Sequence, residues 1–372
     1  MRILVAILLV THALIHVLGF LKAFKIIELN LLSSSISKIY GIYWLIAAIF
    51  FLITTFLLLF KSNYWWLFGF LSVLISQIII IVFWKEAKFG TMLNLIIWLA
   101  CMFAYGNFSF SKQVKEEVVQ MLSKVELNKK KELMRVNSIE DVPIPVQNWL
   151  RNCGVNNTFK IKSVYLKQKI LMKLKPQQKK WYKATAQQYF TTYPAAFNWS
   201  VAMNINSIIS MKGRDKLENG NGEMMIKMGS IIPIVNVKNN KKVNEATLQR
   251  FLAEIVWFPS AALSSYISWE YIDDGSAKAT ISMNNITTSG TFFFSENGEF
   301  KKFSTLRYKD LNDVQPKEWE VEVIKNKVFN KIKIPEEIHV TWKLEDGDFT
   351  WLQLKITEIY YNIPAGTIIN TY

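Results

Sequence analysis

The stretch YWWLFGFLSVLISQIIIIVFW, residues 64–84, is 21 residues long and contains no charged side chain. A helix rises about 1.5 Å per residue, so this stretch spans roughly 30 Å, the thickness of the hydrocarbon core of a bilayer. Lys61 precedes it and Lys85 follows it. The stretch therefore predicts a transmembrane helix, and the rest of the chain is interpreted as held at a membrane.

Three further apolar runs flank this one, at residues 3–21, 40–60 and about 89–106. Trp and Tyr gather near the ends of the runs, as expected at the interfaces between membrane and water. The first run resembles a signal peptide, but no small-residue cleavage site follows it, which favours an uncleaved helix. Residues 1–106 are thus predicted to form a four-helix transmembrane region.

The distribution of lysines predicts an orientation. The loops at 22–39 and 85–88 hold five lysines, whereas the short segments on the other side hold only Arg2 and Lys61. The positive-inside rule, which discounts long domains, then makes the loops cytoplasmic and the following domain extracytoplasmic. Counting the three lysines that closely follow the fourth run makes the two sides equal. We interpret the chain as an integral protein of the inner, or cytoplasmic, membrane of a bacterium.

The whole chain of 372 residues carries a net charge of +15. Residues 1–106 contribute +5, and residues 107–372, with 37 basic and 27 acidic side chains, contribute +10. A basic surface beside a bilayer favours anionic headgroups, so membrane lipids are the expected partners. Nucleic acid is not expected, because the lysines are scattered through strand-like segments and match no nucleic-acid-binding module. A protein partner stays unknown.

Residues 107–157 are predicted to form a helical linker, with helices at 111–135 and 145–154. From residue 158 to 372 the apolar period changes to two, which predicts a β-rich domain of about ten strands separated by turn signals such as Asn219-Gly220-Asn221-Gly222. One helix, about 244–256 with Asn244 as its cap, interrupts the strands.

A long antiparallel meander of this kind curls into a barrel or half-barrel, or folds into a sandwich. The predicted fold class is therefore a membrane α-helical region followed by an α+β domain, with a long antiparallel curled sheet and flanking helices. A helix laid against the open side of a curled sheet leaves an apolar interior that can hold a ligand.

His12 and His16 are four residues apart in the first apolar run, so they share one helix face. Such a polar pair within a membrane can ligate a metal or relay a proton. However, the only other histidine is His339, in the soluble part, and the runs contain no Asp or Glu. The favoured interpretation is that the pair packs against, and hydrogen-bonds to, the other spans. No metal and no cofactor are predicted.

Seven residues of the β-rich domain are candidate ligand-binding residues. Glu254 can act as a polar anchor or an acid/base beside large aromatics, although packing of those aromatics onto the sheet is the favoured alternative. An arginine on the concave side of the sheet would orient a carboxylate or phosphate, whereas an ion pair or an exposed edge is equally consistent. The candidates are Arg214, Glu254, Trp257, Phe258, Trp269, Glu270 and Arg307.

No catalytic residues are predicted, because the chain has no GxSxG, P-loop, HExxH or GxGxxG motif and no Cys/His spacing for a zinc site. Several segments do resemble one family. HALIHVLGF in the first run, VPIPVQNWLRNCGV, KGRDKLENGNGEM, LAEIVWFPSAAL and SWEYIDDGSAKATI together resemble an uncharacterised bacterial family of integral membrane proteins with a C-terminal β-rich domain. More loosely, the run of hairpins with inserted helices is similar to the open half-barrels of periplasmic lipoprotein carriers and sensors, a similarity that implies binding of acyl chains.

Three functions follow as hypotheses. The leading one is a non-enzymatic, membrane-anchored binding domain for a lipid or another apolar ligand, for example an acyl chain. The second is a cell-envelope enzyme, which requires Glu254, Glu270, Arg214 and Arg307 to meet in one cleft. The third is a structural or assembly protein, which an unpaired and uncharged edge strand would favour.

Overall fold

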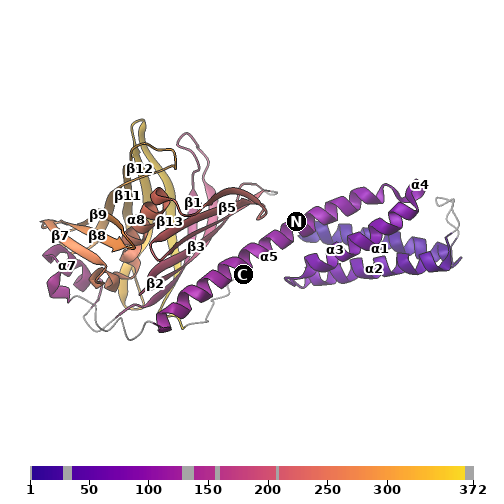
Figure 1. The fold of residues 1–372 in the computed structure, drawn as a ribbon, viewed down its shortest axis with the longest axis horizontal. Coiled ribbons are helices and arrows are strands. Elements are labelled where there is room, and N and C mark those ends of the chain that lie inside the picture. Colours follow the sequence, from indigo (N-terminus) through magenta and orange to yellow (C-terminus); the bar gives the residue numbers. More distant parts are fainter. Residues whose placement is uncertain (1, 28–35, 128–137, 156–159, 207–208, 365–372) are drawn as a thin grey trace. The chain divides into compact units, whose positions relative to one another are not determined.

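The computed structural model describes residues 2–27, 36–127, 138–155, 160–206 and 209–364. The chain divides into two compact units, Met1–Ser111 and Lys112–Tyr372. The first unit is helical, and the second is built on a large sheet (Figure 1). The predicted fold class, four long apolar helices followed by a curled antiparallel sheet with helices, is confirmed.

Four helices of the first unit are long and apolar enough to cross a membrane by length and composition. Their packing relies on small residues, which let helices approach closely in a bilayer. A Cβ added at Gly69 would overlap with the Sγ atom of Cys101, and one added at Gly19 would overlap with the Trp44 ring. The helices are α1 Arg2–Ala23, α2 Lys38–Leu59, α3 Trp65–Val82, the short α4 Trp84–Ala87, and α5 Gly90–Leu127, which continues into the second unit.

Helix α5 differs from the sequence-based expectation. We predicted a span at 89–106 and a separate helix at 111–135, but α5 is one uninterrupted helix from Gly90 to Leu127. No proline lies between the two predicted segments, and the single Gly106 costs a helix only about 1 kcal/mol. Residues 128–135 of the predicted helix lie outside the described residues.

The sheet of the second unit has thirteen strands, all paired antiparallel. The prediction of about ten strands missed the polar strand β4 and merged β5 with β6. The strands are β1 Ser163–Met172, β2 Tyr182–Thr192, β3 Ala195–Asn204, β4 Ser210–Glu218, β5 Asn221–Met228, β6 Ile232–Val237, β7 Ile267–Asp273, β8 Ser276–Met283, β9 Ile286–Phe294, β10 Phe300–Arg307, β11 Lys317–Phe329, β12 Ile332–Leu344 and β13 Gly347–Tyr361.

The strand order shows two meanders joined in the middle of the sheet. It runs β6-β5-β4-β3-β2-β1-β13-β12-β11-β10-β9-β8-β7, so the first and last strands pair with each other. Helix α8, Lys241–Glu254, connects the two edge strands and contacts β4 and β5 on one side and β8, β9 and β10 on the other. The sheet therefore curls around α8 (Figure 1).

Local sequence explains how α8 begins. The side chain of Asn240 accepts hydrogen bonds from the backbone N–H groups of Lys242 and Val243, as an N-cap does. Asn244, which we predicted as the cap, instead accepts a hydrogen bond of 2.8 Å from the N–H of Gly222. A Cβ at Gly222 would overlap with the Thr247 hydroxyl, so this glycine lets α8 lie directly on β5.

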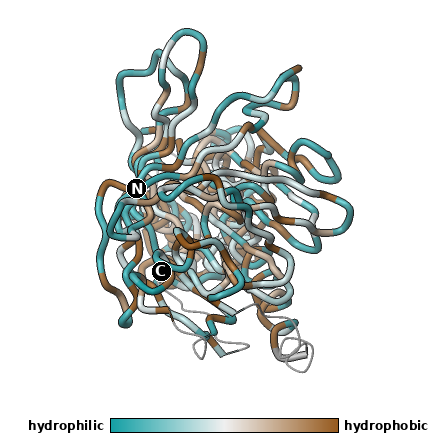
Figure 2. The backbone as a smooth tube through the Cα atoms, turned by 90° about the vertical axis from the view of Figure 1, so that its left-hand side faces the viewer, coloured by the Kyte–Doolittle hydropathy of each residue, from teal (hydrophilic) through white to brown (hydrophobic). Residues whose placement is uncertain are grey.

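The core of the second unit lies between the inner face of the sheet and the helices. Short helices complete it, and Trp149 of α7 is buried against Phe292, Phe294 and Phe300. Figure 2 shows hydrophilic residues concentrated at the hairpin ends, with hydrophobic residues interspersed along the strands. The short helices are η1 Ile139–Asp141, α7 Ile144–Asn152, η2 Ile255–Trp257 and η3 Pro259–Leu263.

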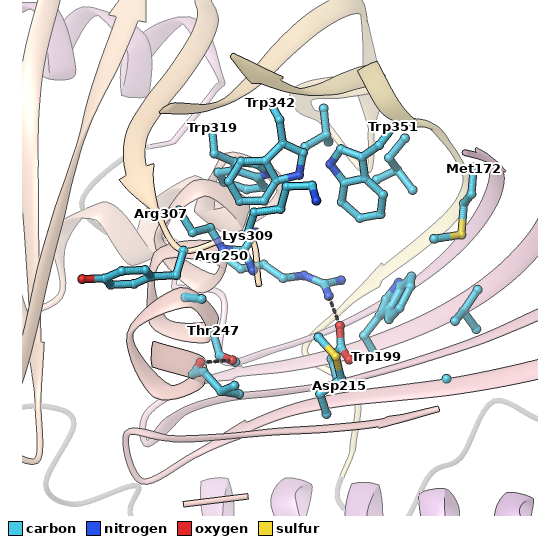
Figure 3. Close-up of a pocket in the computed structure, with 18 of the residues that line it drawn as sticks. Met172, Trp199, Asp215, Thr247, Arg250, Arg307, Lys309, Trp319, Trp342 and Trp351 are labelled. Carbon is cyan, nitrogen blue, oxygen red and sulfur yellow. Dashed lines mark hydrogen bonds and ion pairs between the residues drawn. The ribbon is translucent and has the colours of Figure 1, made fainter. Parts of the chain in front are cut away.

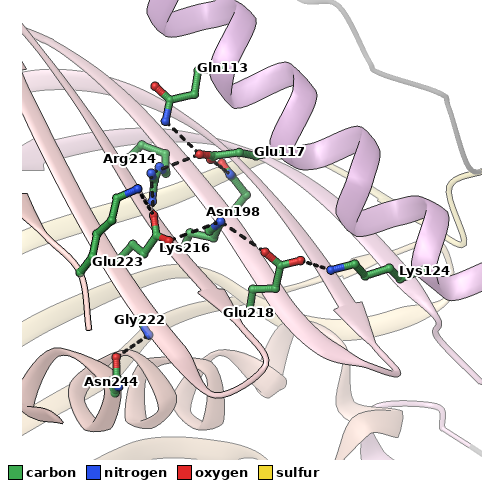
Figure 4. Close-up of polar contacts among 11 residues, drawn as sticks. Gln113, Glu117, Lys124, Asn198, Arg214, Lys216, Glu218, Gly222, Glu223 and Asn244 are labelled. Atoms are coloured by element: carbon green, nitrogen blue, oxygen red, sulfur yellow. Dashed lines mark hydrogen bonds and ion pairs between the residues drawn. The ribbon is translucent and has the colours of Figure 1, made fainter. Parts of the chain in front are cut away.

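The C-terminal part of α5 packs on the outer face of the sheet through buried residues at three- and four-residue spacing, Val114, Val118, Met121, Leu122 and Val125. Polar contacts fix its position (Figure 4). Arg214 of β4 has a fully buried side chain and forms ion pairs with Glu117 of α5 at 3.2 Å and Glu223 of β5 at 3.0 Å. Asn198 donates a hydrogen bond of 2.8 Å to Glu117.

Replacing Arg214 should strongly destabilise the second unit. Arg214→Ala leaves two carboxylates without their buried counter-charge, and breaking a buried ion pair in this way costs about 3–5 kcal/mol. We expect a loss of that size in the free energy of unfolding, measured by guanidinium titration of the full chain in detergent with tryptophan fluorescence. Lys112→Ala, which breaks an exposed ion pair with Glu116, should cost less than about 1 kcal/mol. Equal losses in the two variants would contradict the role of burial.

Candidate functional site

A cavity of about 930 Å³ lies between the inner face of the sheet and α8 (Figure 3). Strands from both meanders and the helix contribute its walls. Most of the lining side chains are apolar or aromatic, including Met172, Phe197, Trp199, Val201, Met203, Met211, Ile226, Val235, Ala246, Trp257, Trp319, Val340, Trp342, Phe349, Trp351 and Leu354.

Five tryptophans form much of the wall. Trp199 comes from β3, Trp257 from η2, and Trp319, Trp342 and Trp351 from β11, β12 and β13. Side chains on a strand alternate between the two faces of the sheet, so residues of adjacent strands gather on its inner face. The pairing Trp319↔Trp342 between β11 and β12 places two of these indoles side by side.

A cluster of ion-paired side chains centred on Arg250 lines part of this largely apolar cavity. Arg250, on the inner side of α8, donates through Nη1 to Oδ2 of Asp215 at 2.7 Å and through Nε to Oε1 of Glu254 at 2.9 Å. Its guanidinium also lies over the ring of Trp199, with 4.5 Å between Cζ and the ring centroid. Asp215 belongs to β4, so this cluster also ties the helix to the sheet.

A chain of buried amides holds Glu254 in place. Gln188 donates to Oε2 of Glu254 at 2.7 Å, Gln168 donates to Gln188 at 3.0 Å, and the indole N–H of Trp199 donates to Gln168 at 2.9 Å. Gln168 and Gln188 are fully buried. Oε2 of Glu254 thus accepts from Gln188, and Oε1 accepts from Arg250. Because both carboxylate oxygens have partners, the rotamer of Glu254 is fixed.

Burial shifts the ionisation of these groups. Removal from water raises the pKa of Asp215 and of Glu254, although the charge of Arg250 opposes the shift in both cases. Burial disfavours the charged form of Arg250, but the two carboxylates outweigh it and raise the pKa of that arginine. The arrangement is a cation shared by two carboxylates in surroundings of low dielectric.

Arg307, at the end of β10, is the second arginine of the cavity. Its guanidinium lies over the indoles of Trp319 and Trp342, at 4.7 and 5.9 Å from the ring centroids. Burial, together with the nearby charge of Arg250, lowers the pKa of Arg307 to about 10. The side chain is therefore still a cation at neutral pH.

The structure brings three of the predicted ligand-binding residues to the cavity, namely Glu254, Trp257 and Arg307. Arg214 lies on the opposite face of the sheet, because it is one position from Asp215 and successive side chains alternate. It faces Glu117 of α5 rather than the interior. Arg214, which we predicted as a ligand-binding residue, is therefore not part of the lining of this cavity.

The other three candidates also lie away from the cavity lining. Phe258 is buried against Phe190 and Phe251, which follows the alternative that it packs the core. The indole N–H of Trp269 donates to the carbonyl of Ala262 at 2.9 Å. Glu270 is exposed and pairs with Lys278 across β7 and β8. The four charged residues required by the enzyme hypothesis do not meet in one cleft.

Sequence analysis missed Arg250, Asp215, Gln168 and Gln188. The spacing of Arg250 and Glu254 is i, i+4, a helical ion-pair spacing that was readable in advance. The two glutamines carry no such signal, because only the pairing of β1 with β2 places them together.

His12 and His16 form a second, separate polar cluster inside the first unit. Both side chains are buried, and the Nε2 atom of His12 is 2.9 Å from Oδ1 of Asn94 and 3.1 Å from Oγ of Ser76. The Nε2 atom of His16 is 2.8 Å from the same Ser76 hydroxyl. In the part of the chain that the structure describes, no three His, Cys, Asp or Glu side chains are grouped to hold a metal ion.

The charge cluster of the cavity predicts a pH-dependent variant. Arg250→Met should lower the free energy of unfolding by about 3–5 kcal/mol at pH 7, because Asp215 and Glu254 lose their counter-charge. A carboxyl group whose pKa is higher in the folded than in the unfolded protein stabilises the fold at pH values below its unfolded-state pKa. This stabilisation is lost as the pH rises through the folded-state pKa. The deficit should therefore shrink as the pH falls from 7 towards 5, as measured by guanidinium unfolding. The double variant Arg250→Met, Glu254→Gln should lose less free energy of unfolding at pH 7 than Arg250→Met alone. If the loss does not depend on pH in either variant, the two carboxylates are not the cause of the destabilisation.

Comparison with known proteins supports the family resemblance. No curated protein matches the chain. Among solved structures, the chain is similar to a LolA superfamily protein from Nitrosomonas europaea, with 9% sequence identity, a TM-score of 0.29, and coverage of 58% of this chain and 90% of that one. Residues 140–361 match the profile described as Family of unknown function (DUF6920). Because that match covers more than half of the chain, and confirms the resemblance to an uncharacterised family, the protein belongs to the DUF6920 family.

Proposed function

We propose that the protein is a membrane-anchored binding protein that holds a lipid or another apolar ligand in the cavity between its sheet and α8. The observation that carries this proposal is the cavity itself, with its volume of about 930 Å³ and its largely apolar lining. Ligand sites in proteins are typically about 300–1,000 Å³, mostly apolar, with a few placed polar groups. The four apolar helices would supply the anchor.

The composition of the wall favours a flexible apolar chain as the ligand. Met172, Met203 and Met211 line the cavity together with the tryptophans. Methionine side chains are unbranched and polarisable, so they adapt to ligands of varied shape. Indoles add large apolar area with few rotatable bonds. Such a wall suits acyl chains of varied length and unsaturation.

A polar group inside the cavity is expected in such a site and does not by itself indicate catalysis. Arg250 is engaged by Asp215 and Glu254, and Glu254 is engaged by Gln188, so each is held in fixed geometry. A general acid or base must reach the reacting proton, whereas both oxygens of Glu254 already accept hydrogen bonds. This cluster thus favours binding over the enzyme hypothesis.

The assembly hypothesis has weaker support. Edge strand β6 is uncharged, and Ile232 and Ile234 are exposed on it. However, Pro233 removes one backbone donor from this strand, and proline is a common device for blocking edge-to-edge pairing. The edge is therefore less suited than the cavity to recognising a partner.

As part of the same proposal, the β-rich domain faces the extracytoplasmic side of a bacterial inner membrane, where its ligand would be a membrane lipid.

A photoactivatable lipid tests the proposal. We would add a phosphatidylcholine with a diazirine on its acyl chain to the full-length protein in detergent, irradiate, and identify labelled peptides by mass spectrometry. Labelling is expected on strands that line the cavity, such as β3 and β12, as well as on the membrane helices. Ala246→Phe places a ring in the cavity from α8 and should reduce labelling of these strands several-fold.

Two comparisons make the result specific. Lys241→Phe adds the same ring on the exposed face of α8, outside the cavity lining, and should leave the labelling of β3 and β12 unchanged. Labelling of the membrane helices should be the same in all three proteins. If wild-type labelling is confined to the membrane helices, the proposal is wrong.

A further inference from the structure

The guanidinium of Arg307 has no acceptor within the described residues. It forms no ion pair or hydrogen bond there, and its Nε atom is sequestered from solvent without a partner. The faces of Trp319 and Trp342 lie against it. The Arg307 side chain as a whole is half-buried. A cation without a partner in a largely apolar cavity is unusual, because charged groups withdrawn from water are normally hydrogen-bonded or paired.

Three of the other four cations of the cavity lining have hydrogen-bond or ion-pair partners. Arg250 is bound by two carboxylates, as described above. Lys242 donates to the carbonyls of Leu311 and Asp313 at 2.8 and 2.6 Å, and Lys309 pairs with Asp310 at 2.9 Å. Lys173 lies over the ring of Trp181. Arg307 thus differs from Arg250, Lys242 and Lys309 in forming no hydrogen bond or ion pair within the described residues, whereas Lys173 resembles it in facing an aromatic ring.

The nearby carboxylates do not serve Arg307. Asp215 and Glu254 are close enough to act on its charge, but neither forms an ion pair with it. Both are committed to Arg250, and Glu254 also accepts from Gln188. Two indole N–H groups of the same wall, those of Trp319 and Trp351, also lack acceptors among the described residues. This part of the wall therefore presents N–H donors that have no acceptor in the described structure.

We propose that the cavity takes an anionic amphiphile, with its carboxylate or phosphate on Arg307 and its apolar chain along the methionine- and tryptophan-lined wall. This inference rests on the proposed function and names its ligand class. The planar guanidinium matches carboxylate and phosphate oxygens in bidentate fashion. The indoles beside Arg307 exclude water, which strengthens the contact. The tail is required because most of the remaining lining is apolar or aromatic.

The test compares two probes that differ in the charge of the headgroup and by one methyl group. A palmitic acid with a diazirine on its chain and the methyl ester of that acid would be titrated into the full-length protein in a nonionic detergent. Wild type should bind the acid about tenfold to a hundredfold more tightly than the ester, which is the usual worth of hydrogen bonds to a charged group. Arg307→Gln should abolish this preference by weakening the acid alone, and Arg307→Lys should restore part of it.

The controls separate Arg307 from general charge and from misfolding. Lys309→Gln removes another cation of the lining, one with its own partner, and should leave the preference intact. Arg307→Gln should unfold at no lower guanidinium concentration than wild type, since it removes a half-buried cation that forms no ion pair or hydrogen bond within the described residues. An equal loss of preference in Lys309→Gln would overturn the assignment to Arg307.

Competition experiments distinguish an anionic amphiphile from a small free anion as the ligand. Hexadecyl phosphate should compete with the acid probe, whereas inorganic phosphate or acetate should not; competition by the small anions at equal concentration would mean that the site binds free anions. If neither the acid nor the ester labels the cavity strands, the proposed function fails. If both label equally in wild type and in Arg307→Gln, only the headgroup inference fails.

Discussion

The pairing of β1 with β13 is the interaction on which the rest of the β-rich unit depends. It joins strands almost two hundred residues apart, from Val164↔Tyr361 to Met172↔Leu352. Closing so long a loop costs conformational entropy, which local hairpins do not have to overcome. Once it forms, two separate meanders become one sheet of thirteen strands, and α8 must cross from one edge of that sheet to the other. The cavity exists because the curled sheet and this crossing helix enclose it.

The polar groups of the cavity follow from that enclosure. A polar or charged side chain removed from water must find partners inside the protein. Arg250, Asp215 and Glu254 find them in one another, and a relay of buried amides extends from Glu254 to Trp199. Arg307 departs from this rule within the described residues, and this departure is the basis of the anionic ligand proposed above. On the outer face the corresponding arginine has a structural role, because Nη2 of Arg214 forms ion pairs there with Glu117 and Glu223.

Much of the fold was readable from the sequence. Transmembrane spans are local properties, since a helix in lipid must satisfy its backbone internally and be about 20 apolar residues long. Strand alternation and turn signals are local too, and they predicted the long antiparallel sheet. Strand β4, SMKGRDKLE, was missed because it is highly polar. Its charged side chains find partners only in the folded domain. On the outer face of the sheet, Arg214 pairs with Glu117 of α5 and Lys216 pairs with Glu218. On the inner face, Asp215 pairs with Arg250 of α8.

The sequence by itself thus determined four apolar helices long enough to cross a membrane and a curled antiparallel sheet. It also provided Glu254, Trp257 and Arg307 as candidate residues, since apolar period and residue chemistry are carried by neighbouring positions. Only the tertiary structure decided which face of the sheet each arginine occupies and which carboxylates are already paired. A shift of one position along a strand reverses the face of a side chain. The partners of Arg250 and the isolation of Arg307 depend on strands and a helix that only folding brings together.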